Sequence, residues 1–197
     1  MSDDRLAKQI AFIVEIDKLK SIYRRTLLTD GSRHDNSAEH SWHLAVMAMA
    51  LAEYGAEPVD ACRVMQMVLV HDLVEVYAGD TFVYDVAASQ DKEKRERLAA
   101  DRIFGMLPDD QAREFRVLWD EFELRQTGEA RFAAALDRMQ PVLNNYYTEG
   151  HAWRSHGVKY NDVIERNKHI AAGAPKLWEY VKALIDDAVT KGYLEKE

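Results

Sequence analysis

The sequence is poor in cysteine and in long apolar runs, and each shortage excludes a class of protein. Its 197 residues include one cysteine, Cys62, which cannot form an internal disulfide; it lies in an apolar stretch and is expected to be a small buried residue. No apolar run reaches the roughly 18 residues that a membrane-spanning helix needs. The first residues are acidic and lack the basic and apolar regions of a signal peptide, so we expect a cytoplasmic protein.

Positive charge and helix-breaking residues are also scarce. The net charge of -8 argues against broad binding to nucleic acid, whose phosphates require a basic surface. A small anionic ligand stays compatible with it, because a metal or a few local cations can reverse the field inside one pocket. With only 9 glycines and 4 prolines beside many helix-forming residues, the composition favours helix.

Apolar residues recur at helical spacing along the whole chain, and no stretch alternates with the period of a strand. The pattern predicts an all-α protein that forms a single domain over residues 1–197. A polar loop is expected over 28–36, Ser37, Ser89 and Thr127 are expected as helix caps, and Pro141 as a kink or break. The predicted helices cover about 4–24, 37–54, 58–78, 89–104, 108–123, 127–147, 159–172 and 175–191.

The predicted helix over 58–78 contains an energetic anomaly. Its segment from Val64 to Val76 is apolar almost all round, which predicts burial, yet it carries His71, Asp72 and Glu75 on one side. An unpaired buried charge costs several kcal/mol, and a bound cation removes that cost because imidazole and carboxylate are good ligands of divalent metals. The alternative is a buried His–Asp hydrogen bond with Glu75 reaching solvent.

Further candidate ligands lie on two other predicted helices. His40 and His43 are three residues apart at the start of the helix over 37–54 and can share one face, with His43 favoured as a packing residue. Asp137 follows a run of small residues that leaves room for close helix packing. Alone, it would be read as a surface partner of Arg138 or Arg131.

Taken in order, these motifs resemble those of the HD-domain metal-dependent phosphohydrolases, over about residues 15–150. The resemblance is strongest to the branch of bacterial 5'-deoxynucleotidases and their eukaryotic HD-domain relatives, and it implies an HD-domain helical bundle with residues 151–197 packed on the metal-binding core. The motifs are Glu39-His40, His71-Asp72-Leu73-Val74-Glu75, Gly79-Asp80 and Leu136-Asp137.

The resemblance also implies a role for each matching residue. It places one divalent ion (Mn, Co, Mg, Fe or Zn) on His40, His71, Asp72 and Asp137. Glu75 would orient or deprotonate the water nucleophile, and Asp80 would lie near the sugar and leaving group. Arg24 and Arg33 would contact phosphate, although either could be a solvated surface charge.

The substrate side of the family pattern is less complete in this chain. Arg25 stands where the deoxynucleotidases have a sugar-selecting Trp, the loop over 26–36 is longer, and the segment after Asp80 lacks their proline. We therefore expect a phosphomonoesterase that acts on nucleoside 5'-monophosphates or similar small esters. We expect no nucleic-acid or membrane partner, and a homo-oligomer is possible. The alternatives are a nucleotide phosphodiesterase or pyrophosphohydrolase, a metal- or nucleotide-binding sensor without turnover, and a plain helical interaction module.

Overall fold

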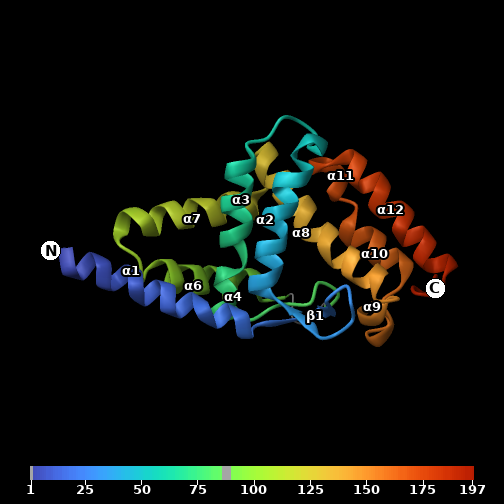
Figure 1. Ribbon diagram of the computed structural model, residues 1–197, viewed down its shortest axis with the longest axis horizontal. Coiled ribbons are helices and arrows are strands. Elements are labelled where there is room, and N and C mark those ends of the chain that lie inside the picture. The colour runs from blue at the N-terminus through green and yellow to red at the C-terminus, as the bar shows by residue number, and fades with distance from the viewer. Residues whose placement is uncertain (1, 86–89) are drawn as a thin grey trace.

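The structure is a computed structural model that describes residues 2–85 and 90–197, and helices dominate it, as the sequence predicts (Figure 1). Three short 3₁₀ helices, η1 (Asp17–Ser21), η2 (Ala52–Tyr54) and η3 (His71–Val74), connect longer elements. The α-helices are α1 (Ser2–Ile16), α2 (Ser37–Leu51), α3 (Ala61–Val70), α4 (Glu75–Ala78), α6 (Lys92–Phe104), α7 (Asp109–Leu124), α8 (Gly128–Tyr147), α9 (His151–Ser155), α10 (Tyr160–Asn167), α11 (Ile170–Gly173) and α12 (Pro175–Thr190).

The N-terminal segment differs from the single helix predicted over 4–24. Helix α1 gives way to η1, and the chain then forms a small antiparallel hairpin of β1 (Tyr23–Leu27) and β2 (His34–Asn36). Tyr23 pairs with Asn36, and Leu27 pairs with His34. This hairpin could not be predicted from the sequence. Its strands are short, one of them consists of three polar residues, and neither shows an alternating apolar pattern. It holds Arg24 next to the start of α2.

The helix predicted over 58–78 is interrupted at its charged residues. Helix α3 ends at Val70, and the chain passes through η3 before it resumes as α4. Asp72 in η3 and Glu75, the first residue of α4, both line one cavity.

Two of the three predicted caps fall on described residues. Asn36 rather than Ser37 caps α2, because the Asn36 side chain accepts the Glu39 backbone N–H at 3.0 Å. Thr127 caps α8 as predicted, accepting the Ala130 N–H. The cap predicted at Ser89 lies outside the described residues. Pro141 neither breaks nor ends α8, which continues to Tyr147.

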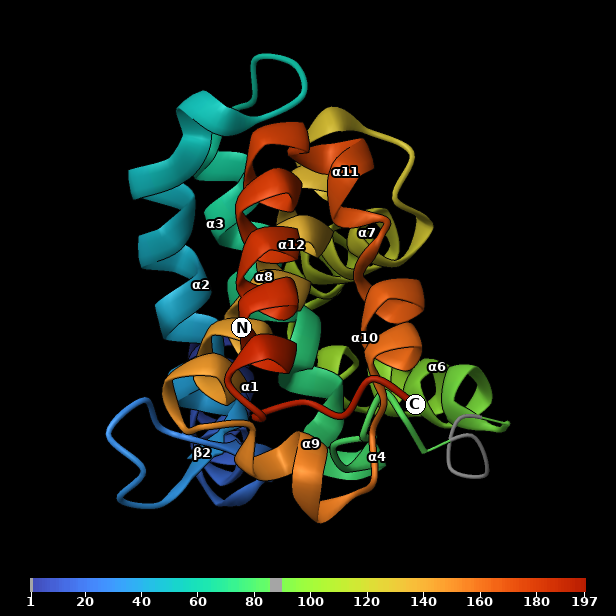
Figure 2. The same cartoon turned by 90° about the vertical axis from the view of Figure 1, so that its right-hand side faces the viewer.

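Helix α8 passes through the middle of the molecule, with α2 and α3 along one side and α10, α11 and α12 along another (Figures 1 and 2). Its run of alanines is buried, and α11 packs so closely on it that a Cβ at Gly173 would lie 2.1 Å from the carbonyl oxygen of Arg131. One apolar cluster extends from Phe12 to Leu194, and the division into core and C-terminal helices stays a prediction.

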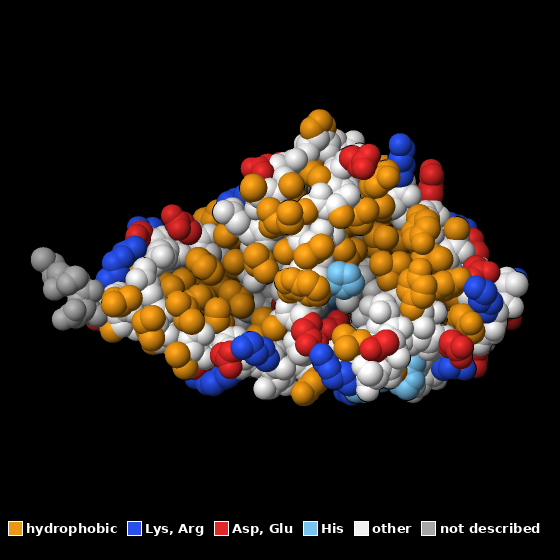
Figure 3. Space-filling model, in the orientation of Figure 1, with side chains coloured by type: hydrophobic (Ala, Val, Ile, Leu, Met, Phe, Trp, Pro, Cys, Tyr) orange, Lys and Arg blue, Asp and Glu red, His pale blue; other side chains and the backbone are white. Residues whose placement is uncertain are grey.

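Several apolar side chains lie outside this core. Cys62, expected to be buried, is exposed because it lies in the first turn of α3, on the side away from the core. Figure 3 shows a broad apolar area over one face of the molecule, which includes exposed residues of α1 and α2. None of the helices described here is long and apolar enough to cross a membrane. The exposed large apolar residues of α1 and α2 are Leu6, Ile10, Ile13, Val14, Trp42, Val46 and Met49.

Candidate metal centre

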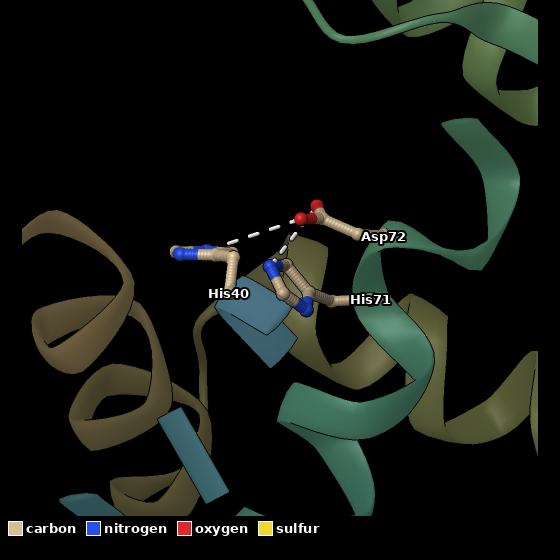
Figure 4. A group of neighbouring side chains, drawn as sticks. All are labelled: His40, His71 and Asp72. Atoms are coloured by element: carbon tan, nitrogen blue, oxygen red, sulfur yellow. Dashed lines mark ion pairs between the residues drawn. The ribbon is translucent and has the colours of Figure 1, made fainter. Parts of the chain in front are cut away.

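Three elements bring two histidines and two aspartates together beside a cavity. His40 comes from the first turn of α2, His71 and Asp72 from η3, and Asp137 from the middle of α8; all four are at most 8% exposed. Nitrogen atoms of His40 and His71 and an oxygen of Asp72 lie within 4.8 Å of one another, and Figure 4 shows these side chains converging. Asp137 Oδ1 lies 3.1 Å from His40 Nε2 and 3.7 Å from His71 Nε2.

The orientation of both imidazole rings is fixed by acceptors behind them. His71 Nδ1 lies 2.8 Å from the Val68 carbonyl oxygen, which can only accept, so Nδ1 carries the proton. His40 Nδ1 lies 3.0 Å from Gln140 Oε1. The amide of Gln140 is oriented in turn, because its nitrogen donates to Asp35 Oδ2 at 3.2 Å. Each ring therefore presents Nε2 to the cavity side.

These Nε2 atoms meet carboxylate oxygens, which is the arrangement that a cation stabilises. His71 Nε2 is 3.0 Å from Asp72 Oδ1 but is not aligned for a hydrogen bond, and it has no hydrogen-bond partner among the described residues. If both imidazoles were neutral, the lone pair on each Nε2 would face a negative oxygen, which is repulsive. If both were protonated, burying two imidazolium charges would cost free energy. A divalent cation accepts imidazole nitrogen and carboxylate oxygen together, so this donor set fits a metal.

The pKa values of the group reflect the same conflict. Burial and the charge of Arg24 lower the pKa of His40. Burial also lowers the pKa of His71, but the carboxylates of Asp72 and Asp137 outweigh it and raise that pKa to about 9. Burial favours the protonated form of Asp137 and so acts to raise its pKa. Arg138 and the two histidines outweigh burial and hold that pKa well below the usual value. The site thus keeps negative oxygens and imidazoles at close range.

Arg24 extends from β1 into the same cavity. Its Nη1 donates to Asp72 Oδ2 at 3.1 Å and lies 3.8 Å from Asp80 Oδ1. Burial disfavours the charged guanidinium, but Asp72 and Asp80 outweigh that effect and raise the pKa of Arg24. A permanent planar cation therefore lies beside the candidate ligands, in the form that binds a phosphoryl group.

Glu75 and Asp80, the two predicted catalytic carboxyl groups, both line the cavity, and their roles stay predictions. Glu75 is buried and accepts a hydrogen bond from Ser37 Oγ at 2.5 Å. Burial, followed by the charge of Asp72, raises the pKa of Glu75 well above its usual value. Burial likewise raises the pKa of Asp80, which follows Gly79 at the end of α4. Both groups can hold a proton more readily than an exposed carboxylate does.

Other predicted residues lie elsewhere. Arg33 makes two hydrogen bonds to the Glu39 carboxylate, of 2.8 and 2.6 Å, and is not among the residues that line the metal-centre cavity. The hairpin turn between β1 and β2 directs it away from Arg24. His43 lies beside the Trp42 ring, outside the group of candidate ligands.

Some residues of this region were missed in the sequence. Gln140 holds His40 and follows Asp137 by three positions on α8, so helical spacing alone could have indicated it. Asp35 completes that hydrogen-bonded chain from β2, whereas the sequence left its role in the loop open. Lys92, Arg125 and Arg138 line the cavity from three different elements, and nothing in their local sequence predicts that they meet there.

Comparisons with known proteins identify the family of the chain and proteins of similar structure. The sequence pattern of the family described as "HD domain" matches residues 16–178. The crystal structure of a predicted metal-dependent phosphohydrolase from Magnetospirillum magnetotacticum MS-1 is similar over 99% of this chain and 98% of its own, with a TM-score of 0.94 and 55% identity.

Curated relatives are more distant in sequence. The human 5'-deoxynucleotidase HDDC2 is 29% identical over 135 residues, 68% of this chain and 65% of its own length, so slightly less than two thirds of that protein is matched. The 5'-deoxynucleotidase HDDC2 of Xenopus laevis is 26% identical over 182 residues, 91% of this chain and 84% of its own.

Proposed function

This chain belongs to the HD-domain family, and we propose that it is a metal-dependent phosphohydrolase that releases phosphate from nucleoside 5'-monophosphates or similar small phosphate esters. The observation that carries the proposal is the pair of imidazoles, each held through Nδ1 and aimed through Nε2 at Asp72 and Asp137. The names of the curated relatives support the nucleotide class of substrate.

His40, His71, Asp72 and Asp137 would hold one divalent cation, and Mn, Co, Mg, Fe and Zn all accept this mixture of nitrogen and oxygen ligands. When bound, such an ion supplies the charge that lowers the pKa of water and polarises a phosphoryl oxygen. Gln140 and the Val68 carbonyl keep both rings in the tautomer that leaves Nε2 free to bind.

The surrounding side chains would bind and orient the ester. Arg24 would exchange its contact with Asp72 Oδ2 for the phosphoryl oxygens, to which its fork of N–H donors is complementary. Glu75, held by Ser37, would orient the attacking water and accept its proton at a carboxylate oxygen. Asp80, close to Arg24, would face the leaving group and its sugar.

A panel of phosphate esters crossed with divalent metals tests the proposal, with released phosphate as the readout. We expect turnover of at least one nucleoside 5'-monophosphate with at least one metal. A metal-loaded protein that releases no phosphate from any ester would overturn it and favour a binding protein. The self-association expected from the family stays a prediction, which the exposed apolar residues of α1 and α2 support.

A further inference from the structure

The cavity of the metal centre carries more basic side chains than one phosphoryl group requires. Arg24 is assigned to the reacting phosphoryl group, yet Lys92, Arg125, Arg138 and the exposed Arg25 also line the cavity. Carboxyl groups line it too, so the pairing of each basic side chain decides which of them is free for a second anion. These carboxyl groups, besides those of the candidate ligands, are Glu75, Asp80, Glu96 and Glu123. Lys92 has a local partner, because its Nζ lies 3.4 Å from Glu96 Oε1 on the same helix. Arg138 has an acidic neighbour at a similar distance, Asp137, but that carboxylate is also a candidate metal ligand. Arg125 has no such partner among the described residues.

Arg125 is the less compensated of the two. It ends α7 with a left-handed backbone (φ 53°), a conformation that favours glycine, and its partly buried side chain forms no ion pair with any residue in 2–85 or 90–197. Arg138 lies on α8 with a side chain only 21% exposed, and its ion pair is a long one, 3.5 Å from Nε to Asp137 Oδ2. The other oxygen of Asp137 faces His40 and His71.

A partly buried histidine, His169, lies close enough to both arginines for their charges to act on it. Its Nε2 is buried without a hydrogen-bond partner among the described residues. Burial, followed by the charges of Arg125 and Arg138, lowers the pKa of His169 to about 4, and Asp137 opposes that shift. Arg125 and Arg138 therefore both lie close to His169, on the side of the cavity that holds Asp137, a candidate metal ligand.

We propose that Arg125 and Arg138 form a second anion subsite in this cavity, and that the preferred substrates are nucleotides carrying a second phosphoryl group. The inference rests on the proposed function for the first phosphoryl group, which the metal ligands and Arg24 would bind. Two guanidinium groups suit a second phosphoryl group because each can donate two parallel hydrogen bonds to its oxygens. Because Arg138 Nε lies 3.5 Å from Asp137 Oδ2, a candidate metal ligand, this subsite would lie next to the reacting one.

Arg125→Gly is the decisive variant, because glycine adopts the left-handed conformation without strain while the guanidinium is removed. Lost binding could then not be attributed to a damaged fold. Glu149→Gly is the matched control: Glu149 has the same backbone conformation (φ 54°) and does not line the cavity. Both variants should have a melting temperature equal to or higher than that of wild type, which checks that neither substitution damages the fold.

The metal-loaded enzyme is assayed with a nucleoside 5'-monophosphate, the 5'-diphosphate and the 3',5'-bisphosphate. In Arg125→Gly, kcat/KM for at least one doubly phosphorylated substrate, relative to the monophosphate, should fall tenfold or more, the loss typical of a charged hydrogen bond. The substrate that loses more shows where the second phosphoryl group is attached. A ratio unchanged for both substrates, or equal to that of Glu149→Gly, would overturn the subsite while leaving the proposed function intact.

Binding of inorganic pyrophosphate and inorganic phosphate, measured by calorimetry on the same metal-loaded proteins, separates the two proposals. Arg125→Gly should weaken pyrophosphate about tenfold and phosphate far less. Equal weakening of both anions would overturn the subsite. If pyrophosphate binding depends on Arg125 but no ester is hydrolysed, the subsite stands and the proposed function fails.

Discussion

The two sides of the cavity are built differently. On the ligand side, His40, His71 and Asp137 are buried in helical segments, and a neighbouring acceptor orients each imidazole. On the opposite side, Arg25 is exposed on β1, and the residues that follow Gly79 run without helix or strand to Asp85. One side is formed by residues of helices, whereas the other is formed by an edge of the hairpin and by a loop.

Under the proposed roles, metal binding and substrate selection would be carried out by separate parts of the chain. Buried helical positions hold ligands within the narrow tolerances of a metal ion. Loop positions tolerate change with little cost to the fold, so selectivity can vary around a constant centre. Substitutions on the two sides should therefore alter different measured quantities.

The largest effect is expected on the ligand side. His71→Ala removes one of the two proposed nitrogen ligands, so bound metal and phosphate release should both fall by more than the roughly 100-fold typical of outer-shell partners. Metal content by mass spectrometry and a phosphate assay check this. His43→Ala is the matched control, because His43 lies outside the ligand group, and an equal loss there would contradict the assignment.

Arg24→Gln should weaken substrate binding and turnover and leave metal binding unchanged. Losing a charged hydrogen-bond donor costs about 1.5–3 kcal/mol, so kcat/KM should fall roughly 10- to 100-fold while metal content is retained. Arg33→Gln separates the two predicted arginines, because its guanidinium pairs with Glu39 outside the cavity and less than about a threefold loss is expected. Similar losses for both arginines would contradict this distinction.

Gln140→Leu should loosen the ligand side without removing a ligand. Leucine neither accepts from His40 Nδ1 nor donates to Asp35, so metal affinity, measured by competition with a chelator, should fall about 10- to 100-fold. Gln140→Glu keeps an acceptor for Nδ1 and should retain more of the affinity. An unchanged affinity in Gln140→Leu would show that the ring is oriented without this amide.

The smallest effect is expected at Glu96, whose pKa is raised from 4.5 to about 7, chiefly by burial. Because the folded state holds this proton more tightly than the unfolded state, the stability it contributes is present below pH 4.5 and lost as pH rises through 7. Glu96→Gln cannot titrate, so its free energy of unfolding should exceed that of wild type by on the order of 2 kcal/mol at pH 8 and by little near pH 5. Urea unfolding at both pH values tests this, and an equal difference at the two would refute it.

Much of the ligand side was readable from sequence. His71, Asp72 and Glu75 stand out because charged residues in an apolar helix need an explanation, and the family motif order connects them to His40 and Asp137. All four predicted ligands lie together in the structure, although their roles stay predictions. Their meeting depends on α2, η3 and α8 packing as the family fold requires, and helix periodicity predicts α2 and α8 well.

The rest escaped for identifiable reasons. The hairpin that carries Arg24 and turns Arg33 away is set by long-range pairing rather than by an alternating pattern. The apolar pattern continues with helical spacing through His71, so it predicts one unbroken helix and gives no sign of the 3₁₀ turn there. Arg125 lies where glycine is favoured, so its position in the cavity follows from the local backbone and not from a motif.

The distance along the chain between the candidate ligands has a consequence for folding. His40 and Asp137 are 97 positions apart, and η3 lies between them. An ion held by all three segments would close long loops as a covalent cross-link does, and so would reduce the conformational freedom of the unfolded chain. The cation would then tie the first third of the sequence to the last, and the thermal stability of the whole molecule would rise and fall with its occupancy.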